Sequence, residues 1–299
     1  MSLFFLALNR CAATISEPHC GIPLLISMNN KELLEIIQQA AKRQATVLHL
    51  FNKGLTALPP ELFKLSQLEE LGLSCNQLTT IPPAIAKLSQ LKVLYLSNNQ
   101  LTALPPAIGK LSHLKLLYLS GNQLAALPSQ FSKLSRLEAL YLNDNQLIVL
   151  DKSISRLSHL LILNLNKNLL TTLPARMGKL SHLEMLYIKD NRLNFLPAKM
   201  SKLPNLRQLY LSGNKLTKLP YEYYKLSQLK KLTLFENPLP IELAFLKLVN
   251  QPAKIINRLN RQMLRQKLEE EKRYNLITNI IGGGLITVFI IIILVFWVG

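Results

Sequence analysis

The chain has 299 residues, of which 49% are hydrophobic, and a formal net charge of +18 at pH 7. Charge alone would suit nucleic acid, but no recognition motif or stacking groove accompanies it, so we expect no nucleic-acid partner. The three cysteines, Cys11, Cys20 and Cys75, form no paired cluster of the kind that closes a disulfide-capped domain, which favours a reducing compartment.

Residues 1–27 fit neither a helix pattern nor the repeat that follows. The apolar run Met1–Leu8 lacks the basic segment of a signal peptide, and Arg10 interrupts it. We predict either a disordered extension or a mis-assigned start, with Met28 as the true first residue.

Residues 28–44 are predicted to form an N-terminal capping helix. Asn30 is the expected N-cap, and Glu32 lies in the first turn. The spacing of the apolar residues indicates one buried stripe: Leu33, Leu34, Ile36, Ile37 and Ala40.

From residue 45 to residue 250 the sequence repeats with a period of 23 residues, in about eight or nine copies. A period of this length predicts a stacked solenoid. Within each copy, a Leu-x-Leu segment alternates apolar and other residues, as in a short strand with one buried face. Leu94 and Leu96 should therefore point inward, while Val93, Tyr95 and Ser97 point outward.

Two columns of the repeat are assigned to the fold. An asparagine follows each strand, where bent backbone needs partners for its amides and carbonyls. A proline begins each return segment and fixes its backbone φ angle. Asp151 replaces that proline in the fifth copy, so a looser return is expected there. The asparagine column contains Asn76, Asn99, Asn122, Asn145, Asn168, Asn191, Asn214 and Asn237.

These columns resemble the leucine-rich repeat family, and the 23-residue length with its Leu-Pro-x-x-Ile/Phe ending resembles the intracellular, Ras-group type. The resemblance covers about residues 45–239. It implies an α/β fold: a right-handed horseshoe with a parallel concave sheet. It also implies a protein partner and, by analogy, a small GTPase or a GTPase regulator.

The candidate binding site is the outward face of the strands. Tyrosine is enriched at binding hot spots, and apolar patches mark interaction sites. The alternative is that tyrosine belongs to the repeat consensus and packs on tyrosine. The site residues are Tyr95, Tyr118, Tyr141, Tyr187 and Tyr210, with Val93, Leu116, Ile162 and Met185 beside them.

Two further columns lie on the surface. One is a basic row, either a consensus feature or an attraction to anionic lipid: Lys64, Lys87, Lys110, Lys133, Arg156, Lys179, Lys202 and Lys225. The other contains His113, His159 and His182, which we interpret as ordinary surface residues. No cofactor, metal or catalytic motif is expected, so we predict that the chain is not an enzyme.

The last part of the sequence predicts a membrane anchor. Residues 276–298 are uncharged and mostly apolar, and a helix of about 20 residues spans a bilayer. Residues 251–275 predict a basic juxtamembrane helix, either a solvated stalk or a helix on anionic headgroups. Its cations are assigned to the membrane surface: Lys254, Arg258, Arg261, Arg265, Lys272 and Arg273.

Positive charge before the span and none after it predict that the solenoid faces the cytoplasm, as in a single-pass, tail-anchored protein. The sequence therefore predicts an interaction scaffold at the cytoplasmic side of a membrane. The alternatives are an extracellular recognition receptor of reversed orientation and a non-catalytic regulatory subunit of a separate enzyme.

Overall fold

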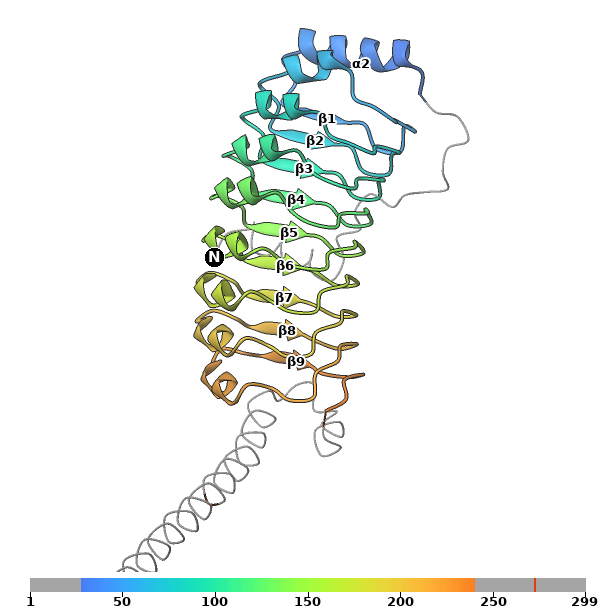
Figure 1. The fold of residues 1–299 in the computed structure, drawn as a ribbon. Coiled ribbons are helices and arrows are strands. Elements are labelled where there is room, and N and C mark those ends of the chain that lie inside the picture. The colour runs from blue at the N-terminus through green and yellow to red at the C-terminus, as the bar shows by residue number, and fades with distance from the viewer. Residues whose placement is uncertain (1–27, 240–271, 273–299) are drawn as a thin grey trace, which may run out of the picture.

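The computed structural model describes residues 28–239 and Lys272 (Figure 1). The predictions for residues 1–27, for the juxtamembrane helix apart from Lys272 and for the anchor at 276–298 lie outside the described residues. The same holds for the solenoid beyond residue 239. Among the residues described, no helix has the length and apolar composition that crossing a bilayer requires.

The described residues form a solenoid whose strands make one parallel sheet in sequence order, as Figure 1 shows. Each strand pairs with the next in a register shift of one repeat, so Leu71 lies opposite Leu94 and Leu94 opposite Leu117. This confirms the predicted stack of strands. The strands are β1 (Val47–His49), β2 (Glu70–Gly72), β3 (Val93–Tyr95), β4 (Leu116–Tyr118), β5 (Ala139–Tyr141), β6 (Ile162–Asn164), β7 (Met185–Tyr187), β8 (Gln208–Tyr210) and β9 (Lys231–Thr233).

A second wall is built from short 3-10 helices, one after each of the strands β1 to β8 in the described part of the chain. Most begin directly after a proline whose φ lies between −58° and −72°. These helices are η1 (Pro60–Lys64), η2 (Pro83–Lys87), η3 (Pro106–Lys110), η4 (Ser129–Lys133), η5 (Lys152–Arg156), η6 (Ala175–Lys179), η7 (Ala198–Lys202) and η8 (Tyr221–Lys225).

Leucine fills the space between the two walls. Leu94 and Leu96 are fully buried, as the alternation predicted, and so are Leu101 and Leu111 of the return segment. Burying one such side chain stabilises the fold by about 1.5–3 kcal/mol. A single repeat cannot bury its leucines alone, so this stabilisation requires the neighbouring repeats. Ser97 is also fully buried, so the expectation that it points outward is wrong.

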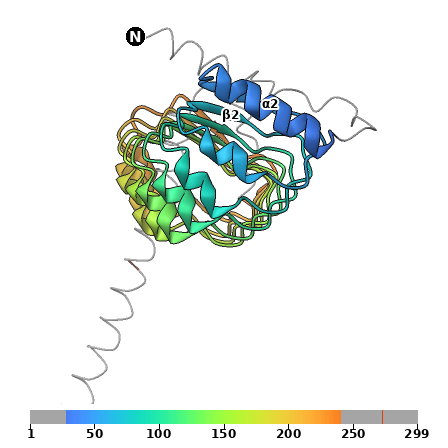
Figure 2. The same ribbon diagram turned by 90° about the horizontal axis from the view of Figure 1, so that it is seen from above.

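Helix α2 (Asn30–Lys42) lies across the β1 end of the stack (Figures 1 and 2). Leu33, Ile37 and Ala40 are buried and join the leucine core. The N-cap is Asn29, and not Asn30 as the sequence suggested. Asn29 and Glu32 form a reciprocal capping box, with Glu32 N–H donating to Asn29 Oδ1 at 2.9 Å.

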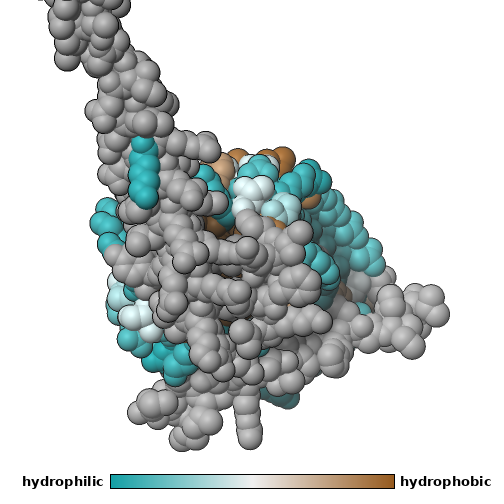
Figure 3. Space-filling model, turned by 90° about the horizontal axis from the view of Figure 1, so that it is seen from below, coloured by the Kyte–Doolittle hydropathy of each residue, from teal (hydrophilic) through white to brown (hydrophobic). Residues whose placement is uncertain are grey.

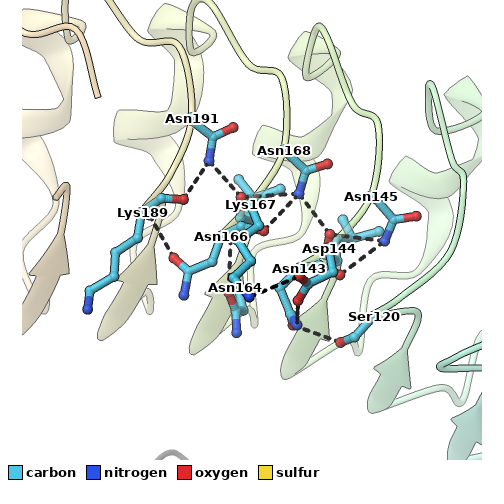
Figure 4. Close-up of polar contacts among 12 residues, drawn as sticks. Ser120, Asn143, Asp144, Asn145, Asn164, Asn166, Lys167, Asn168, Lys189 and Asn191 are labelled. Atoms are coloured by element: carbon cyan, nitrogen blue, oxygen red, sulfur yellow. Dashed lines mark hydrogen bonds and ion pairs between the residues drawn. The ribbon is translucent and has the colours of Figure 1, made fainter. Parts of the chain in front are cut away.

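The asparagine column joins each repeat to the one before it. Asn145 is typical: its Nδ2 donates to the carbonyls of Leu119 and Leu142 at 2.9 and 3.1 Å. Its Oδ1 accepts from the Leu124 amide at 3.0 Å. The same pattern recurs along the column, and Figure 4 shows three of its members. The predicted structural role is confirmed.

Asp151 does not loosen its repeat. Its φ of −62° matches that of the prolines, and helix η5 has the same five-residue length as the others. The Asp151 carboxylate accepts a hydrogen bond from the Ser153 amide at 2.7 Å. A capping bond thus replaces the rigidity of proline. The Ser153 hydroxyl, then the Ser153 backbone amide, lower the pKa of Asp151, and Lys152 contributes a smaller attraction.

The residue before each asparagine adopts a left-handed conformation, which the sequence analysis did not foresee. Gly121 and Gly213 have φ values of 65° and 69°. The equivalent positions elsewhere hold residues with side chains, and φ is 62° at Cys75 and 52° at Lys167. Because a Cβ disfavours this region, each non-glycine residue here carries local strain that the surrounding bonds must hold.

Candidate protein-binding face

The outward residues of the nine strands form one surface, which we call the strand face. Its central column holds the tyrosines, and a second column holds Val93, Leu116, Ile162 and Met185. Strand pairing brings successive members of each column side by side, because Tyr95 pairs with Tyr118 and Ile162 with Met185. The structure thus gathers every predicted site residue on one face.

The tyrosines form two stacks rather than one continuous row. Tyr95, Tyr118 and Tyr141 stack with ring centroids 4.7 and 4.8 Å apart and interplanar angles of 13° and 2°. Tyr187 and Tyr210 stack at 4.5 Å and 11°. Such offset ring pairs add about 0.5–1.5 kcal/mol each beyond the area that they bury.

Several of these side chains are less exposed than the sequence suggested. Tyr118, Ile162 and Met185 are 3%, 2% and 5% exposed, so the expectation of open side chains is wrong there. Ile162 and Met185 pack with Ala139 in a small apolar cluster that Tyr141 and Tyr187 adjoin. By contrast, four other residues of this face remain partly exposed: Val93, Tyr95, Leu116 and Tyr210. The apolar column therefore supports the tyrosine rings as well as presenting surface.

The second stack is held by its hydroxyl groups and by cations. Tyr210 Oη donates to Gln208 Oε1 at 2.7 Å. The Nζ atoms of Lys231 and Lys189 lie 5.0 and 5.7 Å from the centre of the Tyr210 ring. Burial, and then the nearby Tyr210 and Tyr141, raise the pKa of Tyr187, so its phenol stays neutral at ordinary pH.

At the β1 end, Gly72 interrupts the tyrosine column. A Cβ on Gly72 would overlap the ring of Phe51, so this ring occupies the space that a side chain at 72 would need. The Phe51 ring packs edge-on against Tyr95, with centroids 5.6 Å apart, and lies tilted by 36° against His49 at 4.8 Å. His49 Nε2 also lies 2.7 Å from Glu70 Oε1. The Glu70 carboxylate therefore has a polar partner beside these aromatic rings.

Polar side chains run beside the tyrosine column, and Asn164 takes the place between the two stacks (Figure 4). Ser120 Oγ donates to Asn143 Oδ1 at 2.7 Å, and Asn143 Nδ2 donates to Asp144 at 2.8 Å. Asn164 takes the tyrosine position in β6 and accepts the Asn166 amide at 3.1 Å. These amides are surface groups, unlike the buried asparagines directly behind them.

The basic row ends the 3-10 helices, and all eight of its side chains are exposed. From Lys64 to Lys202 none forms an ion pair with a described residue, whereas Lys92, Lys115 and Arg207 do so with Glu69, Glu138 and Glu184. Seen from the β9 end, much of the visible coloured surface is hydrophilic (Figure 3). Within the predicted membrane-surface set, Lys272 is described; it is helical and exposed.

The histidine column ties neighbouring repeats together. Nδ1 of His159 and His182 lies 2.8 and 2.7 Å from the carbonyls of Ser135 and Ser158, so each Nδ1 carries the proton and donates. The two rings stack at 5.9 Å. Within the described part of the chain, no group of three His, Cys, Asp or Glu side chains could hold a metal ion.

Two features of the surface were not predicted from the sequence. Ile148, Val149 and Phe195 are more than half exposed, at 53%, 58% and 53%, on the turns that lead into the 3-10 helices. Their columns elsewhere hold mainly Thr or Ala, and comparing columns copy by copy would have found them. In addition, Cys75 is disulfide-bonded, and its partner lies outside residues 28–239, which contain no other cysteine.

A family model described as leucine rich repeat matches residues 43–101, 89–147 and 181–239, which together exceed half of the chain. No curated protein sequence matches significantly.

Solved structures give the same fold. A leucine-rich repeat protein of Leptospira interrogans is 34% identical over 67% of this chain and 57% of its own, with a TM-score of 0.61. The plant peptide hormone receptor RGFR1, solved in complex with RGF2, is 31% identical over 65% of this chain and 33% of its own, with a TM-score of 0.59. Internalin C2 of Listeria monocytogenes is 27% identical over 68% and 92%, with a TM-score of 0.58. This chain thus spans less than two thirds of the first protein and about a third of the second.

Proposed function

The chain belongs to the leucine-rich repeat family, and on that premise we propose that it binds a protein partner on the strand face and holds it at a membrane. The observation that carries the proposal is the pair of tyrosine stacks. They place five aromatic rings in one column of a sheet whose other side is fully packed with leucine. Rigid aromatic anchors on a preformed surface lose little conformational entropy when a partner binds.

The membrane part of the proposal rests on the sequence. Residues 276–298 are apolar enough to insert, and the cations before them favour a cytoplasmic solenoid. The exposed basic row adds cations that no described carboxylate neutralises from Lys64 to Lys202. Each lysine close to an anionic bilayer contributes about 1 kcal/mol. Tethering then raises the effective concentration of the bound partner at that surface. By analogy with the Ras-group type, a small GTPase or its regulator is the first partner to test.

The binding test compares two triple variants in affinity capture from cells. Replacing Tyr118, Tyr141 and Tyr187 by alanine should remove the captured partners. Replacing Lys87, Lys110 and Lys133 by alanine should keep them. Circular dichroism spectra of both variants must match that of the parent chain. Unchanged capture by the folded tyrosine variant would refute the proposed binding face.

Orientation needs a separate test. In sealed vesicles with the cytoplasmic side outward, added protease should digest the solenoid and release it from the membrane. Protection of the solenoid would place it on the opposite side. Deleting residues 275–299 should release the chain into the soluble fraction.

A second candidate is an extracellular recognition receptor of reversed orientation. The Cys75 disulfide favours it, because such bonds persist mainly in oxidising compartments. The similarity to plant receptor ectodomains agrees with it. Protection of the solenoid in the vesicle experiment, together with loss of capture in a Cys75→Ser variant, would favour this candidate.

A further inference from the structure

The stretch that runs from the asparagine turn through the 3-10 helix differs between the two halves of the solenoid. We call it the outer segment; it covers residues 101–110 in repeat three and 147–156 in repeat five. In repeats one to four each outer segment contains a single cation, which ends the 3-10 helix, whereas in repeats five to eight each contains two. The four added cations are all exposed: Lys152, Arg176, Lys199 and Lys218.

Exposed apolar side chains occur in the same half of the solenoid. Ile148 and Val149 of repeat five are 53% and 58% exposed, and Phe195 of repeat seven is 53% exposed. The equivalent positions of repeats one to four hold only threonine or alanine. The fold therefore does not need large apolar side chains there, and exposed apolar groups rimmed by charge mark a contact surface.

Hydrogen bonds between outer segments place these side chains on one surface. The Arg192 amide donates to the Leu170 carbonyl at 2.9 Å, and equivalent bonds join repeats five to six and seven to eight. The outer segments of these repeats therefore run side by side in register. Phe195 lies in the same column as Val149, two repeats away, and Lys218 takes this position in repeat eight.

Charge on this surface is mainly positive. In the outer segments of repeats five to eight, the acidic residues are Asp151, which attracts its neighbour Lys152, and Glu222. None of the four added cations forms an ion pair with a described residue. In the turns that precede these segments, Asp144 already has a cationic partner, and Asp190 has none among the described residues. Cations are thus left over to attract an anionic surface.

An anionic bilayer fits this combination of groups. At a bilayer surface, apolar side chains enter the boundary between headgroups and acyl chains, while lysine and arginine attract anionic headgroups. Repeats five to eight are also the half that leads to residue 239, and the sequence continues from there to the predicted anchor at 276–298. Such an anchor raises the effective concentration of the bilayer at this half of the solenoid.

We propose that the outer segments of repeats five to eight dock on an anionic bilayer, with Ile148, Val149 and Phe195 among the headgroups and the four added cations against lipid phosphates. The inference rests on the membrane part of the proposed function and adds an orientation to it. The strand face, on the other wall of the solenoid, stays open to the protein partner.

The test reads the depth of a single indole. The chain has one tryptophan, so Trp297→Phe gives a background without an indole. Phe195→Trp places a reporter on the proposed surface, and Ala103→Trp places one at the equivalent, exposed position of repeat three. Both full-length proteins are reconstituted into nanodiscs of phosphatidylserine and brominated phosphatidylcholine. Quenching at 195 should exceed quenching at 103 at least about threefold, because docked side chains enter about 5–10 Å into the boundary.

Variants of the Phe195→Trp protein separate charge from apolar insertion, with quenching measured against phosphatidylserine content. Replacing the four added cations by glutamine should lower the ratio of docked to free solenoid by about a hundredfold or more. Ile148→Thr with Val149→Thr should lower it by about tenfold and leave Tm unchanged, since threonine occupies both columns in other repeats. A matched set of four glutamine substitutions in repeats one to four should lower it by less than about fivefold: Lys64, Lys87, Lys110 and Lys133.

Each outcome supports or overturns the inference. Equal quenching at 195 and 103, or quenching that survives the loss of the four added cations, overturns it. An inserted chain without quenching at 195 also overturns it but leaves the anchor intact. A chain that does not enter nanodiscs refutes the anchor, and the reporters are then read with brominated vesicles added to the soluble chain, where absence of quenching at 195 again overturns the docking.

A protein is the competing occupant of this surface. A blue shift of the indole at 195 in cytosolic extract, without quenching by lipid, would assign the surface to a protein and contradict the bilayer. Capture by the strand face is measured separately with the tyrosine variant, so failure of the docking and failure of the binding face remain distinguishable.

Discussion

The asparagine column behind the strands and the tyrosine column on the strand face repeat with the same period but behave differently. Every asparagine from Asn76 to Asn237 donates and accepts the same inter-repeat bonds. The tyrosine column instead changes at Gly72, Asn164 and Thr233. The asparagines form hydrogen bonds with buried backbone groups, so other residue types are not tolerated there. The tyrosine positions have no such constraint, so different side chains can give each repeat its own binding properties.

The largest expected effect comes from removing one asparagine of the buried column. Asn145→Ala should lower the free energy of unfolding by about 3–5 kcal/mol, because the Leu124 amide and two buried carbonyls lose their partner. Urea unfolding followed by circular dichroism measures this. Asn143→Ala, two residues away on the strand face, is the matched control and should cost less than about 1 kcal/mol. Equal losses would contradict the distinction between the two columns.

A smaller effect separates the tyrosines from one another. Tyr118→Ala should cost about 2–3 kcal/mol, since this ring is buried and stacks on both sides. Tyr210→Ala should cost about 1 kcal/mol, because the ring is partly exposed and stacks on one side. Thermal unfolding of the two variants gives the order. A reversed order would mean that the central tyrosines do not stabilise the fold.

The left-handed position before each asparagine offers a gain in stability. Lys167→Gly should stabilise the chain by about 0.5–1 kcal/mol, because glycine tolerates the φ of 52° and the lost ion pair to Asp144 is exposed. Gly213→Ala should have the opposite sign, since φ is 69° and its new Cβ would overlap Asp190. Denaturant midpoints of both variants test the pair, and a loss of stability in Lys167→Gly would refute the assignment of strain.

The smallest effect concerns Asp151 and is dependent on pH. Hydrogen bonds from the Ser153 hydroxyl and then from the Ser153 amide lower the pKa of Asp151 from its usual 3.8, so the carboxylate form is favoured in the folded state. Its contribution is present above pH 3.8 and is lost as the pH falls below it. Asp151→Asn should cost about half a kcal/mol at pH 7 and nothing at low pH. A constant difference from pH 7 to pH 3 would contradict this origin.

The repeat pattern predicted the strands, the buried leucines and the asparagine bonds, because each depends on local spacing repeated in phase. The pattern shows that Asn164 replaces a tyrosine. It could not predict that this position separates two stacks of rings, because the stacking depends on side-chain orientation. It also placed Tyr118, Ile162 and Met185 in solvent, although neighbouring side chains on the same face bury them. The N-cap moved by one residue to Asn29 because two adjacent asparagines fit the same rule.

The bond of Asp151 to Ser153 likewise depends on a side-chain orientation that spacing does not encode. The left-handed φ could have been predicted for most of its column, because Asn98, Gly121, Asp144, Asp190 and Gly213 are of the types that tolerate it. At Cys75, Lys167 and Glu236 the residue type gives no such signal. The binding assignment itself, from Tyr95 to Tyr210, remains a prediction.

The central claim is that partners bind the strand face and not the wall of 3-10 helices. A photoreactive phenylalanine analogue placed at Tyr187 or at Lys133 tests it in intact membranes. The account predicts a discrete protein cross-link from position 187 and none from position 133. A cross-link from position 133 with none from position 187 would contradict it.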